Sequence, residues 1–231
     1  MCWNEEISLN TFIFSAGTLA FILYSNKYTQ YRIPIFDNKY VILFVMLVIS
    51  IQLIEYFLWK SLKTKNKTMN YTWSIICYIF IFLQPIATLM WVPNDNLRNI
   101  LLTLYITIYG ISAIANPIHF EAKKHKSGHL QWLFADKNQF IDNKINLKNT
   151  LNLLATTIWF IAFFTGFYYL IDFPYFAMIV SLTILILLYY MYNDKLDIFN
   201  SNWCWLANGV ALLLAFTILF VLPYREYKSI C

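Results

Sequence analysis

The sequence predicts an all-α integral membrane protein, a bundle of seven transmembrane helices that forms a single domain. Seven stretches are long and apolar enough to cross a bilayer, which takes about 20 mostly apolar residues. The chain of 231 residues is 60% hydrophobic and 13% charged, whereas about a quarter of the residues of soluble domains are charged. Glu55 is the only charged residue in the interior of any of these stretches.

The predicted spans are continuous apolar runs, not the alternating ten-residue segments of a β-barrel. Turn sequences separate them: residues 93–96 link the third and fourth, Asn116-Pro117 ends the fourth, and residues 172–174 join the fifth and sixth. Pro223 is expected to end the seventh. The spans are Ile7–Ser25, Tyr40–Trp59, Tyr71–Val92, Leu97–Ala115, Leu151–Ile171, Phe173–Tyr192 and Ser201–Leu222.

The distribution of Lys and Arg predicts the orientation, because cytoplasmic loops carry an excess of both. Eleven of the 17 lie in the second, fourth and sixth loops, which share a side with the N-terminus of a seven-span protein. We therefore expect a cytoplasmic N-terminus, an uncleaved first span and an outside C-terminus. Asn66 and Asn70 begin two glycosylation sequons in the second loop, and glycans on them in a eukaryotic secretory membrane would invert this orientation.

The fourth loop, residues 116–149, is long enough to have structure of its own. It is rich in lysine, and we expect it to lie against anionic lipid headgroups. Its apolar residues recur at near-helical spacing, which indicates an amphipathic helix in the headgroup layer; the alternative is a partly disordered basic loop. These apolar residues are Leu130, Leu133, Phe134, Ile141 and Ile145.

Glu55 is the most informative residue for function, because a charged side chain near the middle of a membrane costs several kcal/mol and usually faces a polar interior. Gln52 and Trp59 lie three residues before it and four after it, so the three share one helical face. No Lys or Arg lies deep in any span to neutralise it. Glu55 must therefore be protonated, bind a cation, or line a water-filled cavity. The alternative is that Gln52 and Glu55 form hydrogen bonds that hold helices together.

Two other polar positions lie within spans. Gln84 precedes Pro85, which frees a backbone carbonyl one turn back and kinks the helix. Gln84 could line a cavity with Gln52, or the pair could be a packing kink with Gln84 hydrogen-bonded locally. Asn208 precedes Gly209 in the seventh span, at a depth comparable to that of Glu55, and could bridge to a neighbouring helix.

His119, His125 and His129 fall together in the fourth loop, and His125 and His129 would share a face if the segment were helical. This spacing is a weak metal-site pattern, and the alternative interpretation is a set of histidines near lipid headgroups without a metal. The four cysteines form no CxxC pair. The chain has no glycine-rich phosphate loop, so no cofactor is expected, and no basic stretch of the nucleic-acid-binding kind.

Known seven-helix classes fit poorly, since the last span has no lysine for retinal and no span contains a histidine for a ceramidase-like zinc site. The opening Met1-Cys2-Trp3-Asn4, the stretch Gln52-x-x-Glu55-x-x-x-Trp59 and the pair Gln84-Pro85 resemble an uncharacterised family of multi-pass membrane proteins from large DNA viruses and some microbes. The resemblance implies a seven-helix protein of a host or virion membrane. It implies no activity, so no functional residue is carried over.

The leading hypothesis is a non-enzymatic membrane protein that binds or conducts a small solute or ion. Its polar cavity would be lined by Gln52, Glu55, Gln84 and Asn208. The first alternative is a structural or assembly protein of a viral or organelle membrane, with the basic fourth loop docking a partner or anionic lipid. The second is a membrane metalloenzyme with a metal at the three histidines.

Overall fold

The computed structural model describes residues 4–115, 118–133, 147–192 and 203–230. The protein is mostly helical, at 83%, which agrees with an all-α membrane bundle. The main elements are α1 (Glu5–Tyr28), α2 (Lys39–Lys63), α3 (Lys67–Leu89), α4 (Asp95–Ala115), β1 (Ala122–Lys124), β2 (Leu130–Trp132), α5 (Leu147–Leu170), α6 (Phe173–Tyr192), α7 (Trp203–Phe216) and α8 (Leu222–Ile230).

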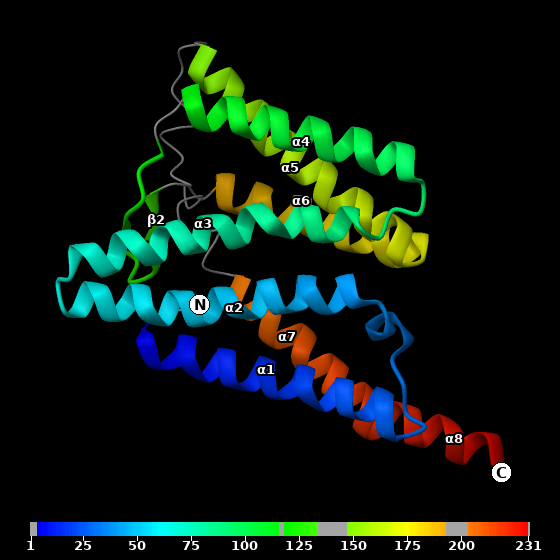
Figure 1. The fold of residues 1–231 in the computed structure, drawn as a ribbon. Helices are drawn as coiled ribbons and strands as arrows, with labels where there is room; N and C mark the ends of the chain where they lie inside the picture. The colour runs from blue at the N-terminus through cyan, green and yellow to red at the C-terminus, as the bar shows by residue number, and fades with distance from the viewer. Residues whose placement is uncertain (1–3, 116–117, 134–146, 193–202, 231) are drawn as a thin grey trace.

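Helices α1, α2 and α3 lie side by side, and each runs antiparallel to the next (Figure 1). A 3-10 turn, η1 (Pro34–Asp37), connects α1 to α2. Helix α5 packs against both α3 and α4, and α7 packs against α1 on the other side of the bundle. Asparagines begin the first three helices: the side chains of Asn4, Asn38 and Asn66 each accept a hydrogen bond from a backbone N–H of the first turn, which satisfies a donor that has no partner within the helix.

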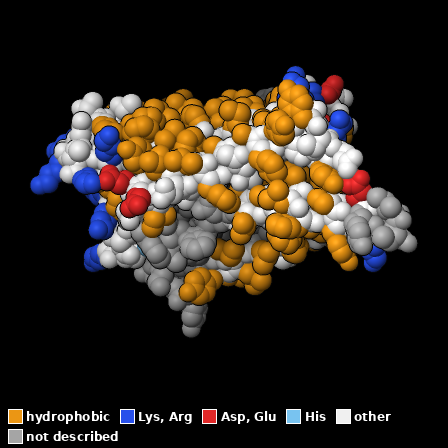
Figure 2. Space-filling view, turned by 90° about the horizontal axis from the view of Figure 1, so that it is seen from below, with side chains coloured by type: hydrophobic (Ala, Val, Ile, Leu, Met, Phe, Trp, Pro, Cys, Tyr) orange, Lys and Arg blue, Asp and Glu red, His pale blue; other side chains and the backbone are white. Residues whose placement is uncertain are grey.

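Apolar side chains cover the middle of the face seen in Figure 2, and Lys and Arg gather toward its ends. Six helices are long and apolar enough to cross a membrane: α1 to α4, residues Thr150–Leu170 of α5, and Gly209–Glu226 at the C-terminal end. The chain is therefore a multi-pass membrane protein. Among the described residues of α6 the apolar segment, Phe173–Ile186, is shorter than these six helices. A seventh span therefore stays a prediction.

The prediction of an interfacial helix in the fourth loop is wrong for the part of that loop that the structure describes. Strands β1 and β2 instead form an antiparallel hairpin in which Ala122 pairs with Trp132 and Lys124 with Leu130. Gly128 takes a φ of +87° at the turn, a conformation that glycine adopts without strain. Leu130 and Trp132 are buried while Gln131 between them is less so, and this period of two belongs to a strand. Phe134, Ile141 and Ile145 lie outside the described residues.

Pro223 does not end the last helix, contrary to expectation. A π-helical turn, η5 (Thr217–Val221), leads directly into α8, and the Leu222 N–H donates to the Thr217 carbonyl five residues back. Proline lacks an N–H and crowds the carbonyl four residues earlier. The wider π turn just before it gives the chain room to stay helical through the proline, as such single turns often do.

Pro85 sits inside α3, and the carbonyls one turn before it bond to neighbouring helices. The Ile81 carbonyl, which Pro85 cannot reach with an N–H, accepts a bond of 3.2 Å from the Trp159 indole of α5. The next carbonyl, of Phe82, accepts a bond of 2.8 Å from the Tyr105 hydroxyl of α4. The carbonyl groups one turn before the proline therefore bond α3 to both α4 and α5, so the kink at Pro85 has a role in helix packing.

This arrangement predicts that Trp159→Phe, which keeps an aromatic ring but removes the donor, lowers the unfolding free energy in detergent by about 1–3 kcal/mol, the cost of an unpaired buried carbonyl. In a Pro85→Ala background the new N–H of residue 85 can bond Ile81 itself. The same tryptophan substitution should then cost clearly less, in a double-mutant cycle. Equal costs in both backgrounds would contradict the role given to Trp159.

Candidate functional site

Gln52 and Glu55 are both completely buried in α2, at 0% exposure. They lie one turn apart on the face shared with Trp59, whose exposure is 8%. Helix α2 is flanked by α1 on one side and by α3 on the other, so a polar pair in its middle lies inside the protein and away from lipid. This burial is what an intramembrane carboxylate requires.

Helix α1 presents a buried row of hydroxyl side chains. The residues at positions 8, 11, 15 and 18 repeat every three or four residues, which places them on one helix face. All four are 7% exposed or less, and α1 packs on α2 and α7. Sequence reasoning based on charged residues missed this row, although its spacing was visible. Together with the α2 pair it forms what we call the polar seam: Ser8, Thr11, Ser15, Thr18, Gln52 and Glu55.

The ion pair between Lys63 and Glu5 sets the register of α1 against α2. Both helices rise about 1.5 Å per residue. Because they are antiparallel, a residue a given number of positions after Glu5 lies at about the height of the residue the same number of positions before Lys63. Thr11 comes to the height of Phe57 and Ser15 to that of Leu53, one on either side of Glu55. The hydroxyl row and the carboxylate therefore occupy the same layer of the bundle.

Helix α3 adds polar groups on the other side of α2. The bond of 3.1 Å from the Asn70 amide to the Ser61 hydroxyl sets this register. Equal steps bring Ser74 to the height of Phe57, close to that of Glu55. Gln84 comes to the height of Leu47, more than one turn from Gln52, so the structure does not place these two glutamines in one layer.

Gln84 and Ser74 are nevertheless buried, at 2% and 0% exposure. Neither Gln84 Nε2 nor Ser74 Oγ has a hydrogen-bond partner among the residues that the structure describes. The local hydrogen bond considered for Gln84 therefore does not involve its amide nitrogen within the described residues. Buried polar groups of this kind commonly hold ordered water.

Asn208 lies in α7, and its side chain is outside the described part of the structure. Gln30 and Tyr31, which follow the end of α1, donate to Glu226 of α8, at 2.7 and 2.8 Å. Helices α1 and α7 run in the same direction (Figure 1) and pack against each other. Asn208 therefore belongs to a helix that contacts α1, and its place in a cavity with Glu55 stays a prediction.

The oxygen atoms of the polar seam are those of a carboxylate, an amide and several hydroxyls. Hard cations such as Na⁺ and Mg²⁺ prefer oxygen ligands of this kind, and a carboxyl group among hydroxyls can also hold a proton. The seam contains no histidine or cysteine. Its chemistry is therefore suited to a proton or a small hard cation rather than to a transition metal.

The three histidines do not form the metal site considered from sequence. His119 lies beside Glu121, at 3.6 Å, and the His125 ring bonds the Ser127 hydroxyl at 2.8 Å. His129 is 9% exposed and directly precedes β2, the return strand of the hairpin. Within the described residues no group of three or more His, Cys, Asp or Glu side chains could share a metal ion.

Burial lowers the pKa of His129 from its ordinary value of 6.5, and the nearby His125 adds to this shift. The folded hairpin therefore holds fewer protons on His129 than the unfolded chain, so its stability is full above pH 6.5 and falls as the pH drops below that value. We expect amide exchange of β2, corrected for intrinsic rates, to accelerate in acid. His129→Asn should remove that pH dependence, whereas His119→Asn, on an exposed side chain, should keep it.

The two sequon asparagines have different environments. Asn66 is exposed and caps α3. Asn70 is 6% exposed, and its amide bonds both backbone groups of Ala122 in β1, at 2.9 and 3.0 Å. A glycan on this buried nitrogen would have no room while the hairpin stays packed against Asn70.

No family model, curated protein or solved structure matches this chain.

Proposed function

We propose that this membrane protein binds a proton or a small hard cation at Glu55 and passes it along the polar seam. The observation that supports this proposal is the complete burial of Glu55 together with the burial of the α1 hydroxyls, which the ion pair of Glu5 and Lys63 puts at similar heights. Hydroxyls at positions 8, 11, 15 and 18 extend about 15 Å along the helix axis. Such a row offers successive oxygen atoms to an ion, which a purely apolar helix contact would not.

The test is ion flux through purified protein in liposomes, with an internal pH dye for protons, an internal sodium dye for Na⁺ and an imposed potential. We expect Glu55→Gln to abolish proton or sodium flux, because the amide keeps the shape and removes the exchangeable proton and the charge. Glu6→Gln, the same change at an exposed position of α1, should leave flux unchanged. Flux that persists in Glu55→Gln would remove Glu55 from the pathway, and wild-type protein without flux would reject transport.

A second candidate function is docking at one end of the bundle. Seven exposed lysines meet there, because the Asn70 bonds to Ala122 hold the hairpin beside the α2–α3 turn. This lysine platform suits an anionic lipid surface, as an assembly protein of a viral or organelle membrane would need. Its members are Lys60, Lys63, Lys65, Lys67, Lys123, Lys124 and Lys126.

Native mass spectrometry of the protein with anionic and zwitterionic lipids tests the lysine platform. Replacing Lys123, Lys124 and Lys126 with Gln should reduce the retained anionic lipid. Replacing Lys27, Arg32 and Lys39 with Gln removes three exposed positive charges at the opposite end of the bundle; this matched control should have little effect. Equal retention in both variants would reject the platform.

A further inference from the structure

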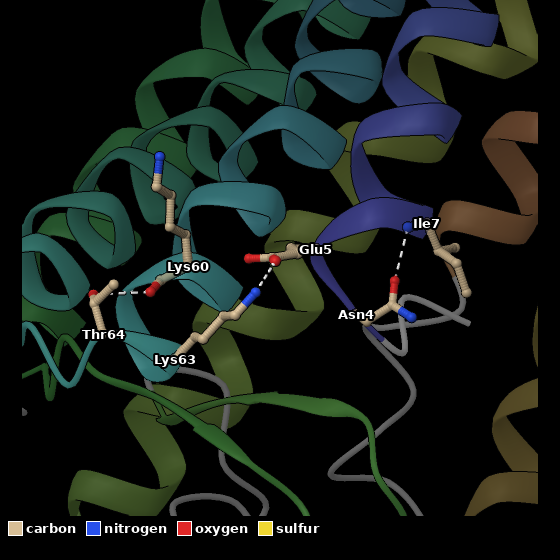
Figure 3. Close-up of polar contacts among 6 residues, drawn as sticks. All are labelled: Asn4, Glu5, Ile7, Lys60, Lys63 and Thr64. Atoms are coloured by element: carbon tan, nitrogen blue, oxygen red, sulfur yellow. Dashed lines mark hydrogen bonds and ion pairs between the residues drawn. The ribbon is translucent and has the colours of Figure 1, made fainter.

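A pocket of about 510 Å³ opens where α1 and α2 meet at the N-terminal end of α1. Figure 3 shows the ion pair of Glu5 and Lys63 crossing between the two helices at this place. Helix α1 begins there, with the Asn4 side chain accepting a bond of 2.9 Å from the Ile7 N–H. The pocket, which we call the mouth pocket, is lined by Asn4, Glu5, Trp59, Leu62, Lys63 and Lys124.

The rim of the mouth pocket is polar and its floor is apolar. The Lys63 side chain is 72% exposed and that of Glu5 is 31% exposed, so water reaches the rim. Trp59 and Leu62 of α2 supply the apolar part, and Trp59 is 8% exposed. The pocket therefore leads from water to the edge of the Trp59 indole.

Both sides of the polar seam begin at this floor. On α2, Glu55 lies one turn below Trp59 on the same face. On α1, Ser8 follows Asn4 by one turn and donates to the Asn4 carbonyl at 3.2 Å. The distance along either helix from the mouth pocket to the first buried seam residue is thus four residues, roughly 6 Å.

The rim carries two lysines and one carboxylate, a balance that disfavours an approaching metal cation. A proton is relayed from one oxygen atom to the next through water and hydroxyl groups, so, unlike a hydrated metal ion, it needs no opening of its own width beside Trp59. We propose that the mouth pocket is the aqueous entrance through which protons reach Glu55, and that the Trp59 indole closes it. This inference rests on the proposed function, since it gives the ion and its route to the same carboxyl group.

Thiol labelling tests whether water enters the pocket, independently of any flux. In a background without the native Cys2, Cys77, Cys204 and Cys231, Leu62→Cys should react with a charged, membrane-impermeant thiol reagent. Leu58→Cys is the matched control one turn away, at 0% exposure in the native chain, and should not react. If Leu62→Cys were as unreactive as the control, the entrance would be rejected.

Modification of native Glu55 by a polar carbodiimide, followed by peptide mass mapping, tests the closing role of Trp59. We expect Trp59→Ala to raise the rate of Glu55 modification by about tenfold or more. Open space then replaces the indole, which lowers the free-energy cost for water and reagent to reach Glu55. Trp59→Phe, which keeps a ring, should stay near the wild-type rate. An unchanged rate in Trp59→Ala would overturn the proposal. An accessible Glu55 in a protein without flux would instead reject transport and leave the entrance standing.

Discussion

Gly166→Ala should destabilise the protein more than any other single-methyl addition to its described glycines. A Cβ at Gly166 of α5 would lie 2.6 Å from Thr88 Cβ of α3, and closer still to the Thr88 carbonyl group. Ala162, one turn earlier, also faces Thr88, whose hydroxyl lies 3.4 Å from the Ala162 carbonyl oxygen. Small residues four positions apart allow helices to approach this closely in membranes. The Thr88 backbone atoms of α3 cannot rotate away from an added methyl group as a side chain could.

The expected cost is about 1–3 kcal/mol of unfolding free energy, as for overpacked cores, and Gly166→Leu should prevent folding. Thermal unfolding in detergent, followed by size-exclusion chromatography, measures both. Gly110→Ala is the control, because a Cβ there meets nothing within 4 Å and alanine favours a helix by about 1 kcal/mol over glycine. If Gly166→Ala were as stable as Gly110→Ala, the close α3–α5 contact would be incorrect.

Asn70→Ala should release the β-hairpin from the bundle. Ala122 is completely buried, and the Asn70 amide satisfies both its N–H and its carbonyl group. Each buried backbone group left without a partner costs about 1–3 kcal/mol, so two together should detach the hairpin from α2 and α3. Limited trypsin digestion should then cleave rapidly after Lys123, Lys124 and Lys126, and amide exchange of residues 120–132 should accelerate.

Two variants test whether the Asn70 side chain itself holds the hairpin. Asn70→Asp keeps an acceptor for the Ala122 N–H and loses the donor to its carbonyl, so its cleavage rate should be intermediate. Asn66→Ala removes a helix cap, which costs about 1 kcal/mol, yet should leave hairpin cleavage unchanged. Trypsin cutting Asn70→Ala no faster than wild type would show that other contacts hold the hairpin.

The positions of the helices were predictable from sequence because lipid demands long apolar runs. The fourth span was expected to end at Ala115, and α4 is described up to that residue, while Asn116-Pro117 lies outside the described residues. Helix ends were less predictable: α2 continues to Lys63, as its polar last turn lies beyond the apolar run. The end expected at Pro223 was wrong because a π turn depends on backbone adjustment that composition does not reveal.

The candidate site was only partly predictable. Glu55 and Gln52 stood out because charge and amide groups are costly in hydrocarbon. The hydroxyl row on α1 was not predicted because Ser and Thr are common in apolar helices and change the mean hydropathy of a segment little. Gln84 was grouped with Gln52 from approximate depth, whereas the hydrogen bond from Asn70 to Ser61 sets a register that separates them. The hairpin depends on Asn70, a residue distant in sequence, so the loop alone could not reveal it.

Infrared difference spectroscopy of the carboxyl band tests most directly whether Glu55 exchanges a proton with water through the polar seam. We predict a band that shifts in heavy water, titrates with pH and disappears in Glu55→Gln while remaining in Glu6→Gln. A spectrum in which Glu55→Gln removes no titrating band would contradict the account, and Glu55 would then be a static contact between helices.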